Sequence, residues 1–370
     1  MKKKVSHISL LILVVLLISP LSRASEKDQD HGSLPDSAVH EETESEFDPG
    51  EFIFDHIGDS YQWHIMTIGE QPISIPLPVI VYSQTKGLDV FFSSRFHHGH
   101  TSYKGYKIAS TGENEGKLVE IMPDGAIQRP FLDISITKNV AAILSSVIIM
   151  ILLFVSVGKR YKKYPYRAPK GLQNLVEIVV KFIRDEIAIP AIGEKHHSKF
   201  MPFLLSLFFF ILLNNIMGLI PIPPGGANVT GNIAVTGALA LLTFLMTNIS
   251  GTRFYWKEIF NSPVVPVWLK VPLPLMPIIE IIGMFTKPFV LMVRLFANIT
   301  AGHIVTLGFV VLIFVFGKMS AALGMGISVL SVTFVIFMTF LELLVAFIQA
   351  YIFTILSALY FGMAIEEEHE

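Results

Sequence analysis

The sequence has no cysteine among its 370 residues, and only 16% of its residues are charged. The first absence excludes disulfide bonds, thiolate metal sites and cysteine nucleophiles. The formal net charge of −2 gives no indication of a nucleic-acid partner. HExxH and GxSxG motifs are absent too, so no hydrolase site, cofactor site or metal site is expected. With 52% hydrophobic residues, the composition predicts an all-α membrane protein that crosses the bilayer several times.

The first 24 residues are typical of a signal peptide. They combine a basic start (MKKK), a short apolar run and small residues at Ser22 and Ala24. An uncleaved membrane anchor is the alternative, but the run over residues 8–18 is short for a bilayer core of ~30 Å.

Two regions without long apolar runs follow the signal peptide. Residues 25–50 are acidic and polar, which predicts a linker. Residues 51–135 contain PISIPLPVIVYS, GLDVFFSSRF and KLVEIM, separated by turn-forming residues. Such short β-branched and aromatic runs predict a small β-rich region, which the signal peptide would place outside the membrane, in the periplasm. Its FHHGH stretch (His97, His98 and His100) is interpreted as a solvated loop rather than a metal site.

Residues 136–370 form the predicted membrane domain. Five apolar blocks predict about five membrane helices, at residues 139–157, 200–222, 231–250, 273–316 and 319–364. The loop GKRYKKYPYRAPK carries six basic and no acidic residues, which places it in the cytoplasm by the positive-inside rule. An outside N-terminus and a cytoplasmic C-terminus at a bacterial inner membrane fit this loop.

The segment LQNLVEIVVKFIRDEIAI, between the first two blocks, predicts an amphipathic helix along the membrane interface. At helical spacing its polar face carries Gln173, Glu177, Lys181 and Arg184. Its apolar face carries Leu175, Val176, Val179 and Ile183.

The last two blocks are too long for one upright span each. As continuous helices they would reach about 65 to 70 Å, twice the hydrocarbon thickness. Either each block folds back on itself, or each is one steeply tilted helix that embraces a partner.

Polar residues interrupt these two blocks, which is rare in hydrocarbon and typical of ion paths. They are Glu280, Lys287, Arg294, Asn298 and His303 in the first block, and Glu342 and Gln349 in the second. Glu280 and Arg294 fall within about 40° of one helix face, roughly 21 Å apart, whereas His303 points away. Because arginine keeps its proton while glutamate and histidine exchange theirs, this layout predicts an interrupted proton path. A buried Arg–Glu pair that fixes helix packing is the alternative, and Lys287 is expected to reach the interface.

The motifs PIIEIIGMFTKPFVLMVRLFANITAGH and LELLVAFIQAYIFTILSALYFGMAIEEEH closely resemble subunit a of the F-type ATP synthases, over residues 136–368. The resemblance implies that two long tilted helices wrap the c-subunit ring and that Arg294 faces the ring's carboxylate. It also assigns proton translocation to a set of matching polar positions: Asn215, Glu280, Asn298, His303, Glu342 and Gln349.

Further implications concern partners and departures from the family. The partners implied are the c-ring, the b-subunit peripheral stalk, other ATP synthase subunits and lipid, without nucleic acid and without a catalytic ATP site in this chain. Many bacterial relatives carry Glu at the position of His303 and His at that of Glu342, and the exchange supports contact between the two positions. Residues 70–128 resemble an insertion. The rival interpretation, an ion-coupled secondary transporter, predicts inverted repeats, and we find none.

Overall fold

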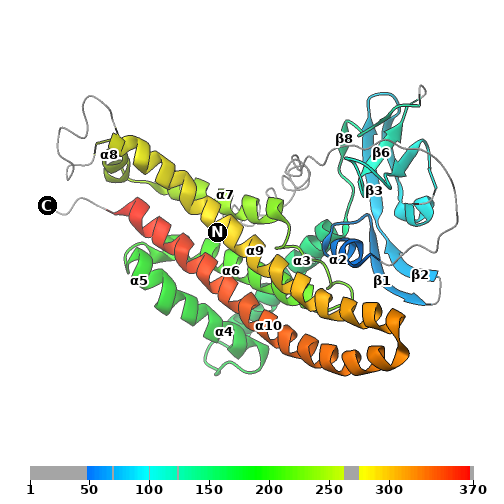
Figure 1. Cartoon of the computed structure of the whole chain (residues 1–370). Helices are drawn as coiled ribbons and strands as arrows, with labels where there is room; N and C mark the ends of the chain where they lie inside the picture. The colour runs from blue at the N-terminus through cyan, green and yellow to red at the C-terminus, as the bar shows by residue number, and fades with distance from the viewer. Residues whose placement is uncertain (1–47, 69–70, 100, 123–124, 262–274, 367–370) are drawn as a thin grey trace. The chain divides into compact units, whose positions relative to one another are not determined.

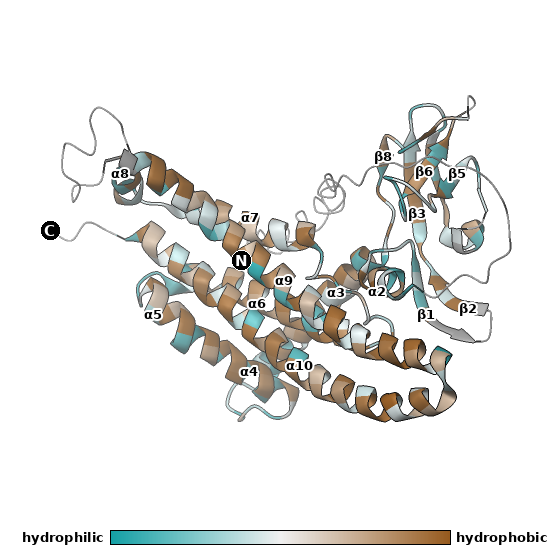
Figure 2. Cartoon of the chain, viewed as in Figure 1, coloured by the Kyte–Doolittle hydropathy of each residue, from teal (hydrophilic) through white to brown (hydrophobic). Residues whose placement is uncertain are grey.

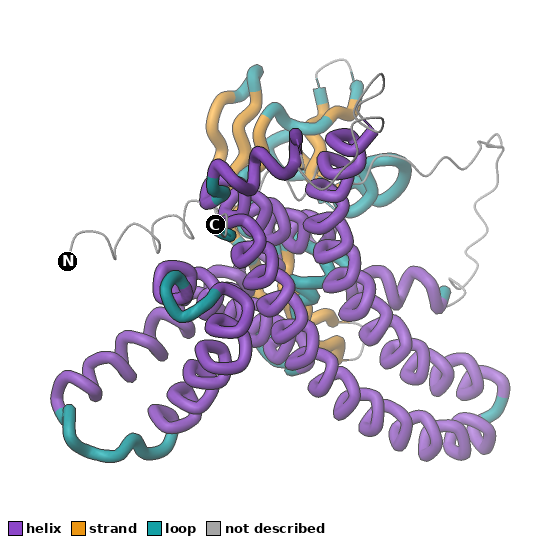
Figure 3. Tube along the Cα trace, turned by 90° about the vertical axis from the view of Figure 1, so that its left-hand side faces the viewer, coloured by secondary structure: helices purple, strands orange, loops and turns teal. Residues whose placement is uncertain are grey.

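The computed structural model describes residues 48–68, 71–99, 101–122, 125–261 and 275–366 (Figure 1). The predicted signal peptide and almost all of the predicted linker lie outside these residues. The described chain forms two compact units: residues 139–299 with 342–366, and residues 48–138 with 300–341. Strands are confined to the N-terminal part of the chain, and helices make up the rest (Figure 3).

The β-rich region begins with helix α2 (Pro49–Ile57), whose N-terminus is capped by the side chain of Asp48, 2.7 Å from the Gly50 amide. Its strands form three small sheets, with the orders β1-β2, β4-β3-β8 and β5-β6-β7. The strands are β1 Gln62–Ile68, β2 Gln71–Pro76, β3 Pro78–Ser83, β4 Gly87–Phe92, β5 Tyr106–Ile108, β6 Leu118–Ile121, β7 Ile127–Gln128 and β8 Leu132–Asp133. The three sequence runs predicted as strands are confirmed, and a 3-10 helix (Ser93–Gly99) follows β4.

A hydrophobic core holds these sheets together. Val79 and Val81 alternate with more exposed residues along β3, as expected for a strand with one buried face. They pack against Tyr61, Phe96, Tyr106 and Leu118, all of them buried.

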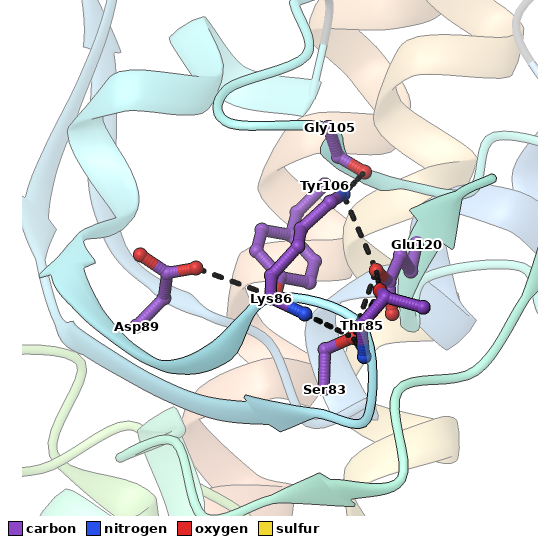
Figure 4. Close-up of polar contacts among 7 residues, drawn as sticks. All are labelled: Ser83, Thr85, Lys86, Asp89, Gly105, Tyr106 and Glu120. Atoms are coloured by element: carbon purple, nitrogen blue, oxygen red, sulfur yellow. Dashed lines mark hydrogen bonds and ion pairs between the residues drawn. The ribbon is translucent and has the colours of Figure 1, made fainter. Parts of the chain in front are cut away.

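A buried carboxylate connects the β3–β4 turn to the β5–β6 hairpin (Figure 4). The Glu120 Oε1 atom accepts hydrogen bonds from the Ser83 hydroxyl at 2.9 Å and the Thr85 hydroxyl at 2.8 Å. The Lys86 ammonium lies 3.3 Å from the same oxygen. Burial alone would raise the pKa of Glu120, but these three donors hold the pKa below its ordinary value. Burial and the nearby Glu120 and Asp89 carboxylates raise the pKa of Tyr106 to about 12.

The membrane part contains the five predicted helices, each long and apolar enough to cross a bilayer. They are α3 (Lys138–Lys163), α6 (His197–Leu219), α7 (Ile233–Ser250), α9 (Leu275–Met319) and α10 (Ala321–Ile365). Hydrophobic residues cover most of their length, while the strands mix polar and apolar residues (Figure 2). The chain is therefore a multi-pass membrane protein. The sequence analysis did not predict the short helix α8 (Arg253–Asn261) that follows α7.

Each of the two longest blocks is a single continuous helix of 45 residues. Pro288 lies inside α9 without ending it. The alternative in which each block folds back on itself is wrong, because the hydrogen-bonded helix runs through the whole block. A short connection at Ser320 joins α9 to α10, and Phe309 stacks on Phe334 close to it. Lys287 and Tyr360 contact each other near the opposite ends, so the two helices run antiparallel.

The predicted amphipathic segment is helical. It consists of α4 (Leu172–Phe182), a π-helical turn (Ile183–Ala188) and α5 (Ile189–Ile192). Gln173, on the predicted polar face, is 5% exposed, and Leu175, on the predicted apolar face, is 61% exposed. Gln173 forms a hydrogen bond with Tyr161 of α3. Lys181 and Glu177 form an ion pair at 2.6 Å, as their spacing predicts.

Candidate functional site

Arg294 lies near the middle of α9, and its side chain is exposed. Among the described residues it forms no ion pair with a carboxylate, so the alternative of a buried Arg–Glu pair that fixes helix packing is wrong. A permanent cation in an apolar helix is costly without a partner. Its exposure in this chain leaves the side chain accessible to a group of another molecule.

Asn215 connects three segments of the chain. It lies on α6, is 4% exposed, and donates from Nδ2 to the Ala346 carbonyl of α10 at 3.3 Å. Its Oδ1 accepts a hydrogen bond from the Thr230 hydroxyl at 2.5 Å. Both of its polar atoms are therefore satisfied inside the protein, which fixes the register of α6 against α10.

The face of α10 that Asn215 contacts also carries two other predicted site residues. Glu342 is four residues before Ala346, and Gln349 is three residues after it, so all three share one helix face. Gln349 is 6% exposed, and Glu342 is partly buried. The structure thus brings Asn215, Glu342 and Gln349 to one side of α10.

Two of the predicted site residues on α9 follow Arg294. Asn298 is exposed, one helical turn further along, and His303 is partly buried. His303 and Glu342 belong to the two separately described units, and the contact between them stays a prediction.

Glu280 lies near the N-terminal end of α9 and is partly buried. Its charge acts on Tyr255 of α8: burial first, and the Glu280 carboxylate second, raise the pKa of the Tyr255 hydroxyl. This proximity places α8 beside the acid that the sequence analysis assigned to the cytoplasmic side.

Some buried polar residues were not recognised as site residues from the sequence. Thr230, 1% exposed, holds Asn215, and Ser146 of α3 accepts a 3.0 Å hydrogen bond from Nδ2 of Asn214. Both are small hydroxyl residues in or beside apolar segments. What marks these residues is a hydroxyl group at the same depth as an asparagine of another helix. That signal cannot be read from the sequence, because it requires knowing which helices are neighbours.

Together, five helices of membrane-spanning length among the described residues, an exposed arginine on one long helix and a polar face on its antiparallel neighbour define an integral membrane protein with polar groups inside its apolar helices. The comparisons with known proteins agree with this class. Residues 140–362 match the family described as ATP synthase A chain, and the chain belongs to this family.

Curated relatives carry the same family name. ATP synthase subunit a of Chloroherpeton thalassium is 44% identical over 260 residues, which cover 69% of this chain and 75% of the relative. ATP synthase subunit a 2 of Chlorobaculum tepidum is 39% identical, with 72% and 78% covered. ATP synthase subunit a of Myxococcus xanthus is 38% identical, with 74% and 86% covered. The resemblance seen in the sequence motifs is therefore confirmed.

The N-terminal region has a separate match. Residues 52–134 match a domain of unknown function, which includes the strands and the Glu120 cluster. Within the described residues, no three His, Asp or Glu side chains lie close enough together to hold a metal ion. His97 of the FHHGH stretch is exposed, and His100 lies outside the described residues.

Proposed function

We propose that this chain is the proton-translocating stator subunit of the Fo sector of an F-type ATP synthase. It would form two offset half-channels against a ring of c subunits and couple proton flow through them to rotation and ATP synthesis. Membership of the ATP synthase A chain family supports the assignment. The exposed Arg294 on α9 is the observation that carries it, because a ring carboxylate would supply the missing counter-charge.

Protons would enter from the outside through His303, Glu342 and the polar groups beside them, Asn215 and Gln349. A proton delivered to a ring carboxylate neutralises it, and the neutral carboxyl can turn into lipid. After almost a full rotation the carboxyl loses its proton on the cytoplasmic side near Glu280. The hydrogen bonds of Asn215 support this route, since they hold α6 against the face of α10 that carries Glu342.

Arg294 would separate the two half-channels. An arginine and a carboxylate ~4 Å apart attract each other by about 4 kcal/mol at an effective dielectric constant of 20. This attraction favours the ionised carboxylate beside Arg294, while the arginine itself cannot pass a proton on. Asn298, one turn away and exposed, would contact the same ring surface.

The orientation and partners complete the proposal. The basic loop after α3 supports an orientation in which that end of the helix would lie in the cytoplasm and the β-rich region outside a bacterial inner membrane. The c-ring would cover the exposed arginine face, and the b-subunit stalk would hold the subunit still. The C-terminus would lie in the cytoplasm.

The test is Arg294→Lys in the assembled complex. We expect ATP-driven proton pumping to be lost, because an ammonium pairs less well with a carboxylate and can release its proton. Arg184→Lys, the same substitution at an exposed residue of the π-helical turn, should leave pumping unchanged. Pumping that persists in Arg294→Lys, with the complex intact on native gels, would refute the role of the arginine.

A further inference from the structure

The sheet β4-β3-β8 of the β-rich region has an outer face made of apolar residues. Successive residues of a strand point to opposite faces, and Val79 and Val81 of β3 point into the core. The outer face of β3 and β4 therefore consists of three cross-strand pairs: Pro78 with Phe92, Ile80 with Val90, and Tyr82 with Leu88. The β4 residues of these pairs, Leu88, Val90 and Phe92, are 66%, 59% and 57% exposed.

The third strand extends this face. Leu132 of β8 pairs with Tyr82. Beyond β8 the backbone still pairs with β3, through two hydrogen bonds of 2.9 Å: from the Ile134 amide to the Ile80 carbonyl and from the Ile136 amide to the Pro78 carbonyl. Leu132, Ile134 and Ile136 therefore point to the same side as the three pairs, and together these residues are called the outer apolar face below.

The polar residues of the three strands lie on the inner side instead. Ser83 of β3 donates to Glu120 at 2.9 Å, and Asp133 of β8 accepts a hydrogen bond from the Tyr61 hydroxyl at 2.6 Å. An antiparallel sheet with one face in water normally carries its polar residues on that face. The reversed arrangement indicates that the outer apolar face is covered by a partner or by lipid.

The length of the connection to α3 brings this face close to a bilayer. Ile136 is two residues before Lys138, the first residue of the membrane helix α3, which corresponds to at most ~7 Å of chain. Lys138 belongs to the same compact unit as the sheet, and its amide donates to the Ser60 carbonyl at 2.8 Å. Leu132, at the far end of the face, is ~13 Å further along the strand.

The composition of the face favours lipid over the chain's own N-terminal residues as its cover. Phe131, 68% exposed, contacts Tyr82 edge-on at 6.2 Å between ring centroids, and aromatic side chains are typical of the boundary between membrane and water. Residues 25–47 contain eight acidic residues and only three large apolar ones. Such a polar segment has too little apolar surface to cover the face.

We propose that the outer apolar face rests on the surface of the bilayer that α3 enters, with its side chains at the boundary between lipid headgroups and acyl chains. Burial of apolar area holds the face there, since its residues carry no charge. Docking therefore requires neither anionic lipid nor low salt. The inference depends on the chain being a membrane protein and is independent of the proton path.

A fluorescent label on a single cysteine tests the docking, because the chain has no cysteine of its own. The full-length chain with Val90→Cys carries the polarity-sensitive label NBD and is reconstituted into vesicles of phosphatidylcholine alone. We expect a lipid with a nitroxide near its glycerol backbone to remove most of the emission, and aqueous iodide to have little effect. A face bound in this way lies roughly 5–10 Å deep, so a nitroxide at the end of the acyl chain should quench less.

Glu113→Cys is the matched control. Glu113 is exposed in the connection between β5 and β6. Tyr106 of β5 and Leu118 of β6 pack against the inner side of the sheet, so a label at Glu113 lies on the side away from the outer apolar face. Iodide should quench this label, and the lipid nitroxide should not.

A second position covers the case in which Val90→Cys does not fold. Leu88→Cys should give the same pattern of quenching as Val90→Cys. Adding Phe92→Asp to either variant places a charge on the face and should expose the label to iodide, because an unpaired charge is costly in lipid.

Two outcomes would overturn the docking. Labels at Val90 and Leu88 that only iodide quenches would show that the face stays in water. Labels shielded from both quenchers would show that protein covers it, such as a second copy of the chain. Neither outcome bears on the proposed function, which Arg294→Lys tests separately.

Discussion

Gly362 of α10 is the position where the structure predicts the sharpest effect of a single methyl group. A Cβ atom added there would lie 1.9 Å from the carbonyl oxygen of Ala191 in α5 and 3.1 Å from its carbonyl carbon. Because carbon and oxygen atoms rarely approach closer than about 3.3 Å, α10 and α5 would have to separate by about 1.4 Å. The obstacle is backbone, so no side-chain rotation can relieve it.

The separation would disturb a fully buried neighbour. Phe361, the preceding residue, is 0% exposed and stacks on Phe200 of α6 at 4.8 Å between ring centroids. Overpacking of this kind costs about 1–3 kcal/mol. For a chain of 370 residues we expect Gly362→Ala to lower the melting temperature of the detergent-solubilised protein by about 1–4 °C.

Gly158→Ala is the matched control, since a Cβ at this exposed glycine of α3 meets nothing within 4 Å. It should leave the melting temperature unchanged or raise it slightly, because alanine is favoured over glycine in a helix by about 0.5–1 kcal/mol. Thermal unfolding followed by size-exclusion chromatography of both variants provides the measurement. Equal melting temperatures would show that the close approach of α10 to α5 is wrong.

Three further predictions concern polar groups. Asn215→Leu removes the hydrogen bond to the Ala346 carbonyl and should lower the free energy of unfolding by about 1–3 kcal/mol. It should also slow passive proton conduction in vesicles stripped of the soluble sector. Unchanged conduction would refute a role for Asn215 in the proton path. Because the pKa of Glu120 is lowered in the folded state, its stabilising effect is complete above the ordinary value of 4.5 and is lost as the pH falls through the lowered value. The hydrogen-exchange protection factors of β5 and β6, which are corrected for the intrinsic exchange rate, should therefore fall in acid in the wild type, and Glu120→Gln should show a smaller pH dependence. The double exchange His303→Glu with Glu342→His should pump protons faster than either single variant, and purely additive losses would argue against contact between the two positions.

The helical content of the membrane part could be predicted because hydropathy and length act locally. An apolar block of membrane-spanning length has to satisfy its backbone hydrogen bonds within itself, so it becomes a helix whatever its neighbours are. The same local logic predicted the strands around Val79 and Val81, where apolar residues alternate. The length of α9 and α10 excluded single upright spans, but it left folding back and tilting open, and only the structure excluded the former.

The candidate site, too, could be predicted from the sequence only in part. Periodicity placed Glu280 and Arg294 on one face of α9, and Glu342 and Gln349 on one face of α10, because a regular helix fixes the angle between any two of its residues. It gave no information on what lies opposite each face. The hydrogen bond between Gln173 and Tyr161 of α3 is an example, since it depends on which helix packs beside Gln173.

The sequence by itself therefore determined that the chain is a multi-pass membrane protein, which helix faces carry its polar residues and which family it resembles. The tertiary structure decided which of those faces meet. The hydrogen bond from Asn215 to Ala346 spans 131 positions of the chain, and the one from Asn214 to Ser146 spans 68. Such contacts depend on how distant segments of the chain pack together. The linear pattern of hydrophobic and polar residues does not determine that packing.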